Sequence, residues 1–248
     1  MLRDRTKSFA ECLKIARRQG KRLDCTDPPL TIDEAYAIQA DVASGTPVSG
    51  FKTARKANQK QTMAPIFSPD TYHSATATQI EFNDRIGIEL EVGIKIVKSL
   101  PTLGSVDFEA EAIGCVIPFI AIELVKTRLC EENEDLELAR LADNQINGGI
   151  VIGPHKPEWN GDTIGCVDAS MAIGGRYLLN EAATVPGGSA MRSFANLARM
   201  IGTHCGGLRT GSFVITGSLH PLQYIDQSTS IHASIGGFGS IDVDLVKI

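Results

Sequence analysis

Alternating hydrophobic and polar positions predict strands along most of the chain. The clearest alternation runs from Ile88 to Ile96, where every second residue is aliphatic. Side chains of a strand point alternately to its two faces, so this segment is predicted to be a strand with one apolar face. Further β-type runs are separated by Gly, Pro and Asn. The predicted strands cover 48–53, 88–98, 113–126, 148–153, 163–179, 212–216 and 231–246, with turns at Gly174-Gly175 and Gly236-Gly237.

Helical spacing of apolar residues predicts one helix over residues 7–20 and another over 189–205, which glycines close. Between them, Thr31 followed by Glu34 forms a capping box. This motif marks the start of a further helix, which should end by Gly45.

Few helices and many short strands predict an α+β protein with a barrel-like or rolled antiparallel core. The first two helices lie in an N-terminal helical region, residues 1–46, and the strands follow in a β-rich core, residues 47–248. We expect the two regions to form one functional unit.

The composition is that of an ordinary globular protein, with 43% hydrophobic and 21% charged residues. The net charge of -5, without a basic stripe that carries aromatic residues, argues against nucleic-acid binding. No apolar segment approaches the roughly 18 residues that a membrane-spanning helix needs. We therefore expect a cytoplasmic protein with neither a nucleic-acid nor a membrane partner.

The six cysteines are scattered without a C-x-x-C pair, which favours reduced thiols in a cytoplasmic protein. The five histidines do not cluster near them, and this argues against a zinc site.

Two glutamates, Glu89 and Glu91, lie on the polar face of the strand predicted at 88–98. Their Cα atoms should be about 7 Å apart, and two such carboxylates repel each other unless a positive charge lies between them. A divalent cation with oxygen ligands would supply that charge. The alternative is the solvated face of an amphipathic strand.

Two further charged residues lie in apolar strands. Glu123 is a third oxygen ligand if its strand neighbours 88–98, and three carboxylates suit Mg²⁺ or Mn²⁺. Otherwise it forms a salt bridge with Arg128 or Lys126. Lys52 ends another strand, where burial could lower its pKa and let it act as an acid or base. A solvated lysine is the alternative.

Two polar segments are candidates for ligand contacts. Asp143 and Asn144 precede a pair of glycines, which permit close backbone approach, although a plain turn explains the segment equally well. The segment from Thr216 to Ser218 ends a strand, where hydroxyls and amides can hold a carboxylate. His220 is typical of a surface or packing histidine.

Several motifs, taken in order, point to a known family. They are residues 31–39, Gly50-Phe51-Lys52, Glu89-Leu90-Glu91, residues 121–125 with Arg128, Ala142-Asp143-Asn144 leading to Gly148-Gly149, the helix 189–205, and residues 211–219. With this set the chain resembles the 2-keto-4-pentenoate hydratase and 4-oxalocrotonate decarboxylase group of the fumarylacetoacetate hydrolase superfamily.

The resemblance implies a mixed β-roll core with an N-terminal helical region, usually assembled into homo-oligomers. It implies that Glu89, Glu91 and Glu123 hold Mg²⁺ or Mn²⁺. The substrate would be a 2-oxo or 2-hydroxydienoate acid that binds the ion through its carboxylate and 2-oxygen, and the ion would act as a Lewis acid.

Other roles are implied in the same way. Lys52 would move protons as the catalytic residue. Thr216, Gly217 and Ser218 would help to hold the substrate carboxylate, with Asp143 and Asn144 as further substrate-binding residues.

The chain departs from the family pattern in three places. Family hydratases carry an aspartate where this chain has Ile66, so the acid/base partner of Lys52 is missing or is supplied by Asp70 or another group. Lys126 stands where the family favours an aspartate, and Ala54-Arg55-Lys56 replaces Gly-Leu-Thr. These changes add positive charge and remove acids, which is consistent with an extra carboxylate on the substrate or with lost hydratase activity.

We therefore expect a hydratase that adds water to a 2-hydroxydienoate such as 2-hydroxypenta-2,4-dienoate. A 4-oxalocrotonate-type decarboxylase is the first alternative, because Ile66 weakens water addition more than enolate chemistry. An acylpyruvate-type hydrolase is a further alternative, but the histidine–glutamate pair expected near its N-terminus is not seen. The non-enzymatic alternative is a catalytically impaired relative that binds a small acid.

Overall fold

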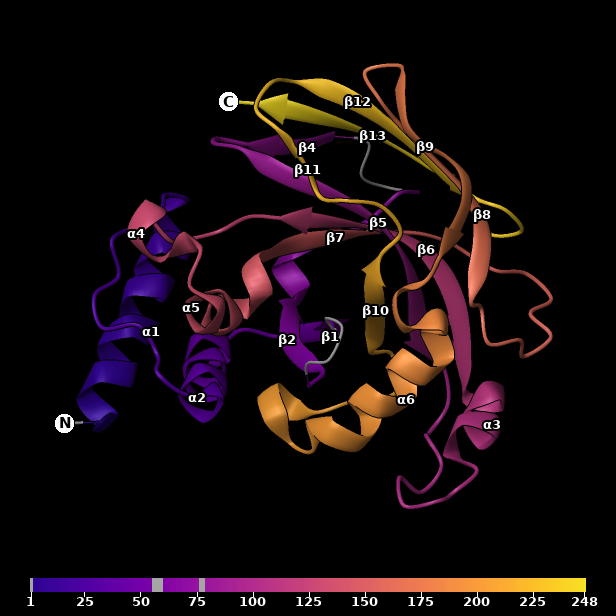
Figure 1. Cartoon of the computed structure of the whole chain (residues 1–248), viewed down its shortest axis with the longest axis horizontal. Coiled ribbons are helices and arrows are strands. Elements are labelled where there is room, and N and C mark those ends of the chain that lie inside the picture. The colour runs from indigo at the N-terminus through magenta and orange to yellow at the C-terminus, as the bar shows by residue number, and fades with distance from the viewer. Residues whose placement is uncertain (1, 55–59, 76–78) are drawn as a thin grey trace.

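The computed structural model of the chain describes residues 2–54, 60–75 and 79–248. In these residues the strands form two sheets, one of eight strands and one of five (Figure 1). The larger sheet has the order β2-β1-β10-β5-β6-β7-β3, with β11 also paired to β5, and the smaller has the order β4-β13-β12-β8-β9. Their bounds are β1 Val48–Ala54, β2 Thr62–Phe67, β3 Thr71–His73, β4 Gln79–Phe82, β5 Ile86–Ile96, β6 Val116–Val125, β7 Asn147–His155, β8 Cys166–Ile173, β9 Arg176–Thr184, β10 Phe213–Ser218, β11 Gln223–Ile225, β12 Thr229–Ile235 and β13 Gly239–Lys247.

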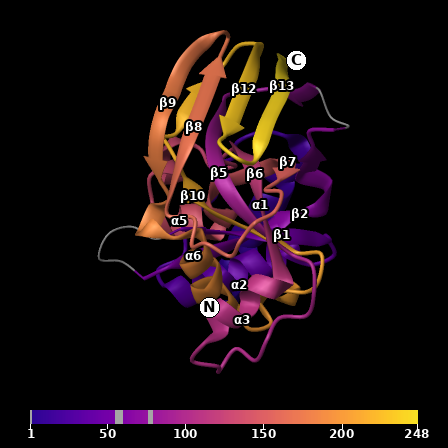
Figure 2. The same cartoon turned by 90° about the vertical axis from the view of Figure 1, so that its right-hand side faces the viewer.

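The helices gather around one end of the larger sheet, away from the strands β8, β9, β12 and β13 (Figure 2). Their bounds are α1 Leu2–Gln19, α2 Ile32–Ala43, α3 Phe108–Ala112, α4 Glu131–Glu134, α5 Glu137–Ala142 and α6 Ala190–Ile201. The larger sheet is mixed, because β1 runs parallel to β10 and β3 parallel to β7 while its other pairs are antiparallel. The α+β class and the mixed core that the resemblance implies are confirmed, whereas the antiparallel core predicted from the strand pattern is wrong, because three strand pairs are parallel.

The two faces of β5 have different surroundings: one packs into the main hydrophobic core, and the other carries the glutamates. Its aliphatic residues from Ile88 to Ile96 are fully buried and pack with α6 and the smaller sheet in one core cluster. The other face carries Glu89, Glu91 and Gly93, which lie opposite Glu123, Ala121 and Phe119 of β6. Because paired residues share a face, all of these side chains point to the concave side of the larger sheet.

A smaller apolar cluster covers part of this concave side. Its buried members are Ile66, Phe119, Ala121, Ile150, Ile152, Phe213 and Ile215, from strands β2, β6, β7 and β10. The curled sheet therefore has an apolar floor that continues into the glutamate-bearing stretch.

The capping box at Thr31 forms with one change. The Thr31 hydroxyl accepts a hydrogen bond from the backbone N–H of Glu34 at 3.2 Å, as predicted. The Glu34 carboxylate accepts from the N–H of Leu30 at 2.7 Å, and it also pairs with Arg5. The helix ends at Ala43, so the predicted stop by Gly45 is confirmed.

Several features differ from the sequence analysis, which predicted neither the disulfide nor the elements β2, β3, β4, β11, α3, α4 and α5. Cys12 and Cys25 form a disulfide, so the expectation that all thiols are reduced is wrong. The turn after α1 brings the second cysteine back beside the helix, with a Cα–Cα distance of 5.7 Å. Strand β2 was not predicted because it contains Pro65, which a sheet tolerates at an edge, and β2 is an edge strand.

None of the described helices is both long and apolar enough to cross a membrane.

Gly93 provides a test of how tightly the concave face is packed. A Cβ atom added at this position would overlap the ring of Phe119, whereas one added at Gly104 would meet no atom within 4 Å. We expect Gly93→Ala to lower the free energy of unfolding by about 1–3 kcal/mol, as overpacking of a core does. Urea unfolding of both alanine variants checks this, and equal stabilities would contradict the packing described.

Candidate active site

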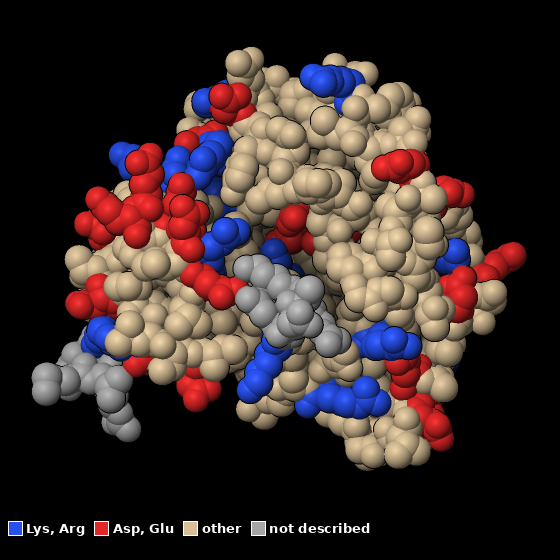
Figure 3. All heavy atoms as spheres, in the orientation of Figure 1, with Lys and Arg blue, Asp and Glu red and all other residues tan. Residues whose placement is uncertain are grey.

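A cavity of about 600 Å³ opens on the concave side of the larger sheet. Figure 3 shows a hollow near the centre of this face, with acidic and basic side chains inside it. Residues of β1, β2, β5, α5 and the end of β10 line it, together with Ile32 at the start of α2. The predicted helical region and the β-rich core therefore both contribute to its wall.

Three carboxylates meet beside this cavity. Glu89 and Glu91 come from β5, and Glu123 comes from β6 directly opposite Glu89. One oxygen from each lies within 4.8 Å of the others, a spacing that permits a shared metal ion. Glu91 is 2% exposed and Glu123 is fully buried, so the alternative of a solvated strand face is wrong.

Burial and mutual repulsion perturb these acids strongly. Burial, followed by the negative charge of Glu123, raises the pKa of Glu89 from 4.5 to about 7. Burial also raises the pKa of Glu91 well above its ordinary value, with further contributions from Glu123 and Glu89. The negative charge of the cluster therefore favours either protonation of these glutamates or the binding of a cation between them.

Lys52 and Asn147 hold one oxygen of Glu123. The Lys52 Nζ donates to Glu123 Oε1 at 2.5 Å, and Asn147 Nδ2 donates to the same oxygen at 2.8 Å. The other oxygen, Glu123 Oε2, is buried and accepts no hydrogen bond from a described group. Glu123 thus pairs with Lys52 rather than with Arg128 or Lys126, the partners considered from the sequence.

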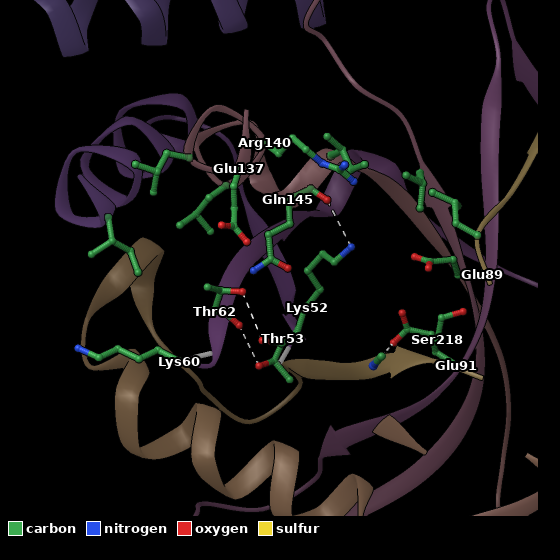
Figure 4. A pocket seen from close by; sticks show the side chains of 18 of the residues that line it. Lys52, Thr53, Lys60, Thr62, Glu89, Glu91, Glu137, Arg140, Gln145 and Ser218 are labelled. Carbon is green, nitrogen blue, oxygen red and sulfur yellow. Dashed lines mark hydrogen bonds between the residues drawn. The ribbon is translucent and has the colours of Figure 1, made fainter. Parts of the chain in front are cut away.

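The surroundings of Lys52 favour its protonated form. Burial alone would lower its pKa, but the negative charges of Glu123, Glu89 and Glu91 outweigh this and raise the pKa above 10.5. Figure 4 shows the Lys52 side chain extending across the cavity between Gln145 and the glutamates. Its Nζ also lies 3.4 Å from the backbone oxygen of Gln145.

The end of β10 meets the same cluster. The backbone N–H of Gly217 donates to Glu91 Oε2 at 2.6 Å, and Gly217 and Ser218 line the cavity. The Ser218 hydroxyl donates to the His220 carbonyl at 2.6 Å.

Thr216 is buried behind the wall, where its hydroxyl donates to the Val92 carbonyl at 2.9 Å. His220 accepts from the Leu90 N–H through Nε2, as a packing histidine does.

Asp143 and Asn144 are buried but are not among the residues that line the cavity. Both oxygens of the Asp143 carboxylate accept from Arg128, at 2.5 Å from Nε and 2.9 Å from the backbone N–H. Arg128 also donates to the backbone oxygens of Asp143 and Asn147. This network fixes the turn before β7, and the predicted substrate contact of Asp143 and Asn144 stays a prediction.

The positions that depart from the family pattern fall in different places. Ile66 lies in the apolar floor, on the same strand as Ala64, which is paired with Lys52. Asp70 lines a separate cavity and its carboxylate is 3.7 Å from Arg17, so the idea that it partners Lys52 is wrong. Lys126 donates to Asn83 and lines that separate cavity as well. Arg55 and Lys56 lie outside the described residues.

Sequence reasoning missed Gln145, Asn147 and Arg140. Gln145 and Arg140 line the cavity, and Asn147 bonds to Glu123. Gln145 lies in a turn where three successive residues have φ near +50°, a left-handed conformation that is rare outside glycine. The run of polar residues after Ala142 was the available signal, but it was attributed to Asp143 and Asn144.

The donor set fits a hard divalent cation. Mg²⁺ and Mn²⁺ bind carboxylate oxygens, and here three carboxylates converge with one buried oxygen that has no partner among the described groups. Burial and, after it, mutual repulsion raise the pKa of Glu89 and of Glu91, and a cation would offset both effects. The geometry therefore supports Glu89, Glu91 and Glu123 as candidate ligands.

No protein-family model matches the chain. Over 249 residues it is 24% identical to the 2-keto-4-pentenoate hydratase of Paraburkholderia xenovorans strain LB400, an alignment that covers 94% of this chain and 91% of the relative. It is also 24% identical over 260 residues to the 2-oxo-hept-4-ene-1,7-dioate hydratase of Escherichia coli, covering 93% and 92%.

A solved structure shows the same fold. The 4-oxalocrotonate decarboxylase from Pseudomonas putida G7, complexed with magnesium and adipate, superposes with a TM-score of 0.79 at 17% identity and with 98% of each chain covered. These similarities extend over almost the whole chain. They confirm the resemblance to the 2-keto-4-pentenoate hydratase and 4-oxalocrotonate decarboxylase group that the motifs predict.

The raised pKa of Glu89 predicts how the metal-free protein responds to pH. A glutamate ionises near 4.5 when unfolded, whereas Glu89 keeps its proton in the folded state up to about 7. The folded state therefore binds more protons over this interval, and stability should fall as the pH rises through it.

Mg²⁺ should counteract that loss. Because the ion needs ionised carboxylates, we expect it to raise the unfolding temperature more at about pH 8 than at about pH 6. Thermal unfolding with and without Mg²⁺ at the two pH values checks this, with Glu89→Gln as the variant in which the difference shrinks. An equal or larger Mg²⁺ effect at the lower pH would contradict the assignment of these ligands.

Proposed function

We propose that the protein is a metal-dependent hydratase that adds water to a 2-hydroxydienoate, such as 2-hydroxypenta-2,4-dienoate. The observation that carries the proposal is the convergence of Glu89, Glu91 and Glu123 beside a cavity, with Lys52 bonded to one of them. Relatives that align over more than nine tenths of the chain are named hydratases, which supports an enzyme of this type.

The metal would be Mg²⁺ or Mn²⁺, held by the three glutamates. When bound, it would act as a Lewis acid that stabilises negative charge on the carboxylate and 2-oxygen of the acid. The backbone N–H of Gly217 holds Glu91 in place, and Asn147 and Lys52 hold Glu123. These bonds orient the glutamates before a ligand arrives.

In the proposed reaction, ketonisation moves a proton from the 2-hydroxyl group to C5 of the substrate. Water then adds its hydroxyl to C4 and its proton to C3. Lys52 is the charged N–H donor of the cavity nearest the glutamates, so we assign to it the transfer of protons to and from the substrate. We propose that the substrate carboxylate binds beside Gly217 and Ser218, because both residues line the cavity, and that Thr216 supports them through its bond to the Val92 carbonyl.

Apolar side chains complete the cavity wall and limit the access of bulk water to the reacting carbons. They come from α2, β6, α5 and the turn before β7, and include Ile32, Val125, Leu138, Leu141 and Ile146. Because Ile32 belongs to the N-terminal helical region, we propose that residues 1–46 and 47–248 act as one functional unit. The homo-oligomeric state and the cytoplasmic location stay predictions.

Decarboxylation is the second candidate. Ile66 places an apolar side chain in the floor near Lys52, so no acid from this position is available to activate water. Loss of CO₂ from a 2-oxo acid requires stabilisation of an enolate and a proton donor, and the glutamate cluster with Lys52 meets both needs.

The deciding experiment is an assay of the purified protein with Mg²⁺ or Mn²⁺, in which products are identified by NMR. We expect 2-hydroxypenta-2,4-dienoate to give 4-hydroxy-2-oxopentanoate. Release of CO₂ from 4-oxalocrotonate without hydration of either acid would assign the protein as a decarboxylase instead. Binding of metal and acid without any turnover would indicate a non-catalytic relative.

Glu91→Gln should abolish turnover and weaken Mg²⁺ binding without unfolding the protein, because it removes one charge from the ligand set. Glu181→Gln, on the exposed face of β9, is the matched control and should behave as the wild type. Isothermal titration with Mg²⁺ and a circular dichroism spectrum accompany the assay. Normal turnover of Glu91→Gln would contradict the proposed metal site.

Lys52→Met should lower kcat by about 10²–10⁴, the usual range for the loss of an acid–base group. The exposed Lys98→Met is the control for the loss of a positive charge. Unchanged kinetics of Lys52→Met would show that another group transfers the proton.

A further inference from the structure

Gln145 places an unpaired hydrogen-bond donor at the cavity. Its side-chain Nε2 is buried and has no hydrogen-bond partner among the groups that the structure describes. Figure 4 shows the side chain turned into the cavity beside Lys52, whereas Glu89 and Glu91 lie on the other side of that lysine. A buried N–H group without an acceptor has lost its hydration without compensation. The amide is therefore suited to a partner that enters the cavity.

The hydroxyl groups near Gln145 in the cavity wall already have acceptors within the protein. The Thr53 hydroxyl donates to the Thr62 carbonyl at 3.0 Å, and the Thr62 hydroxyl donates to the Ala54 carbonyl at 3.3 Å. A hydroxyl has a single proton to donate, so these two groups have none left for a ligand. The Gln145 amide differs from them in this respect.

The turn that carries Gln145 is held in a strained conformation by its surroundings. Gln145 and the residues on either side of it have φ between 50° and 54°, in the left-handed region. Such strain persists where the neighbouring structure fixes it, and it is concentrated at functional sites. Here Arg128 donates to the backbone oxygens of Asp143 and Asn147, which flank the turn. The turn also brings the Gln145 backbone oxygen within 3.4 Å of Lys52 Nζ.

We infer that the Gln145 side-chain amide holds the water molecule that adds to C4 of the substrate. The inference rests on the proposed function, in which the substrate carboxylate and 2-oxygen lie at the glutamates and the carbon chain extends along the cavity toward Lys52 and Gln145. An uncharged amide suits water better than it suits a carboxylate, which binds charged donors more strongly. Because Ile66 is apolar, an acid from that position is not available for this task.

The amide would act in the hydration step alone. The water accepts the Nε2 hydrogen bond through one lone pair and attacks C4 with the other. The C3–C4 π electrons move toward the 2-oxygen to give an enolate, and the proton that the water loses passes to C3. One hydroxyl group and one hydrogen are thereby added, without an oxidant or a reductant. Ketonisation precedes this step and consumes no water, so it does not need the amide.

The test separates ketonisation from hydration in the Mg²⁺-loaded protein, with 2-hydroxypenta-2,4-dienoate as substrate. NMR in D₂O follows both steps, because ketonisation introduces deuterium at C5 and hydration yields 4-hydroxy-2-oxopentanoate. We expect Gln145→Leu to lower kcat for hydration about a hundredfold, the effect of misplacing a reactant. The rate and the KM of ketonisation should stay as in the wild type, so 2-oxopent-3-enoate should accumulate.

Two further variants make the result specific. Gln145→Gly removes the amide but keeps the backbone oxygen beside Lys52, and glycine adopts a φ of 50° without strain. It should therefore stay folded and show the same selective loss of hydration. Gln19→Leu changes an exposed glutamine at the end of α1 and should behave as the wild type. The melting temperature of each variant shows that it is folded.

The outcomes separate this inference from the proposed function. Hydration at the wild-type rate by folded Gln145→Leu and Gln145→Gly would overturn the inference and leave the proposed function intact. Equal losses of ketonisation and hydration would also overturn it, because Gln145 would then support the site as a whole. If the wild type does not hydrate the substrate, the proposed function and the inference both fail.

Discussion

Three carboxylates on the concave side of the larger sheet impose the constraint that organises the site. Burial, followed by their mutual repulsion, raises the pKa of Glu89 and of Glu91, and the positive charge of Lys52 offsets only part of this shift. The surrounding groups are arranged to hold this charge: Gly217 donates to Glu91, and Asn147 and Lys52 donate to Glu123. One buried oxygen, Glu123 Oε2, accepts no hydrogen bond from the described groups. A divalent cation would give it a partner, because such ions bind carboxylate oxygens.

Features with a short-range signal were predictable from the sequence. The alternation from Ile88 to Ile96 specifies β5 and identifies the face that carries the glutamates. The capping box at Thr31 locates the start of α2, because that motif depends on residues within one turn. The glycine pair at 174 and 175 likewise forms the turn between β8 and β9.

Features that depend on distant partners were not predictable. The pairing of Cys12 with Cys25 and of Lys52 with Glu123 depends on how the chain folds back, which no local pattern reveals. The presence of Arg140 and Gln145 in the cavity wall likewise depends on elements that are distant in the sequence. Strand β2 was hidden by Pro65, which is compatible with a strand only because β2 lies at an edge.

The direct pairing of Glu89 with Glu123 also bears on how the sheet reaches its correct alignment. A slip of one residue along β5 would exchange its two faces and drive Glu89 and Glu91 into the aliphatic core. Desolvating unpaired charges there would cost several kcal/mol for each, so such alignments should be rare during folding. The residues proposed to bind the metal would then also protect the newly made chain against misfolding, a role that selects for acidic side chains even before any ligand binds.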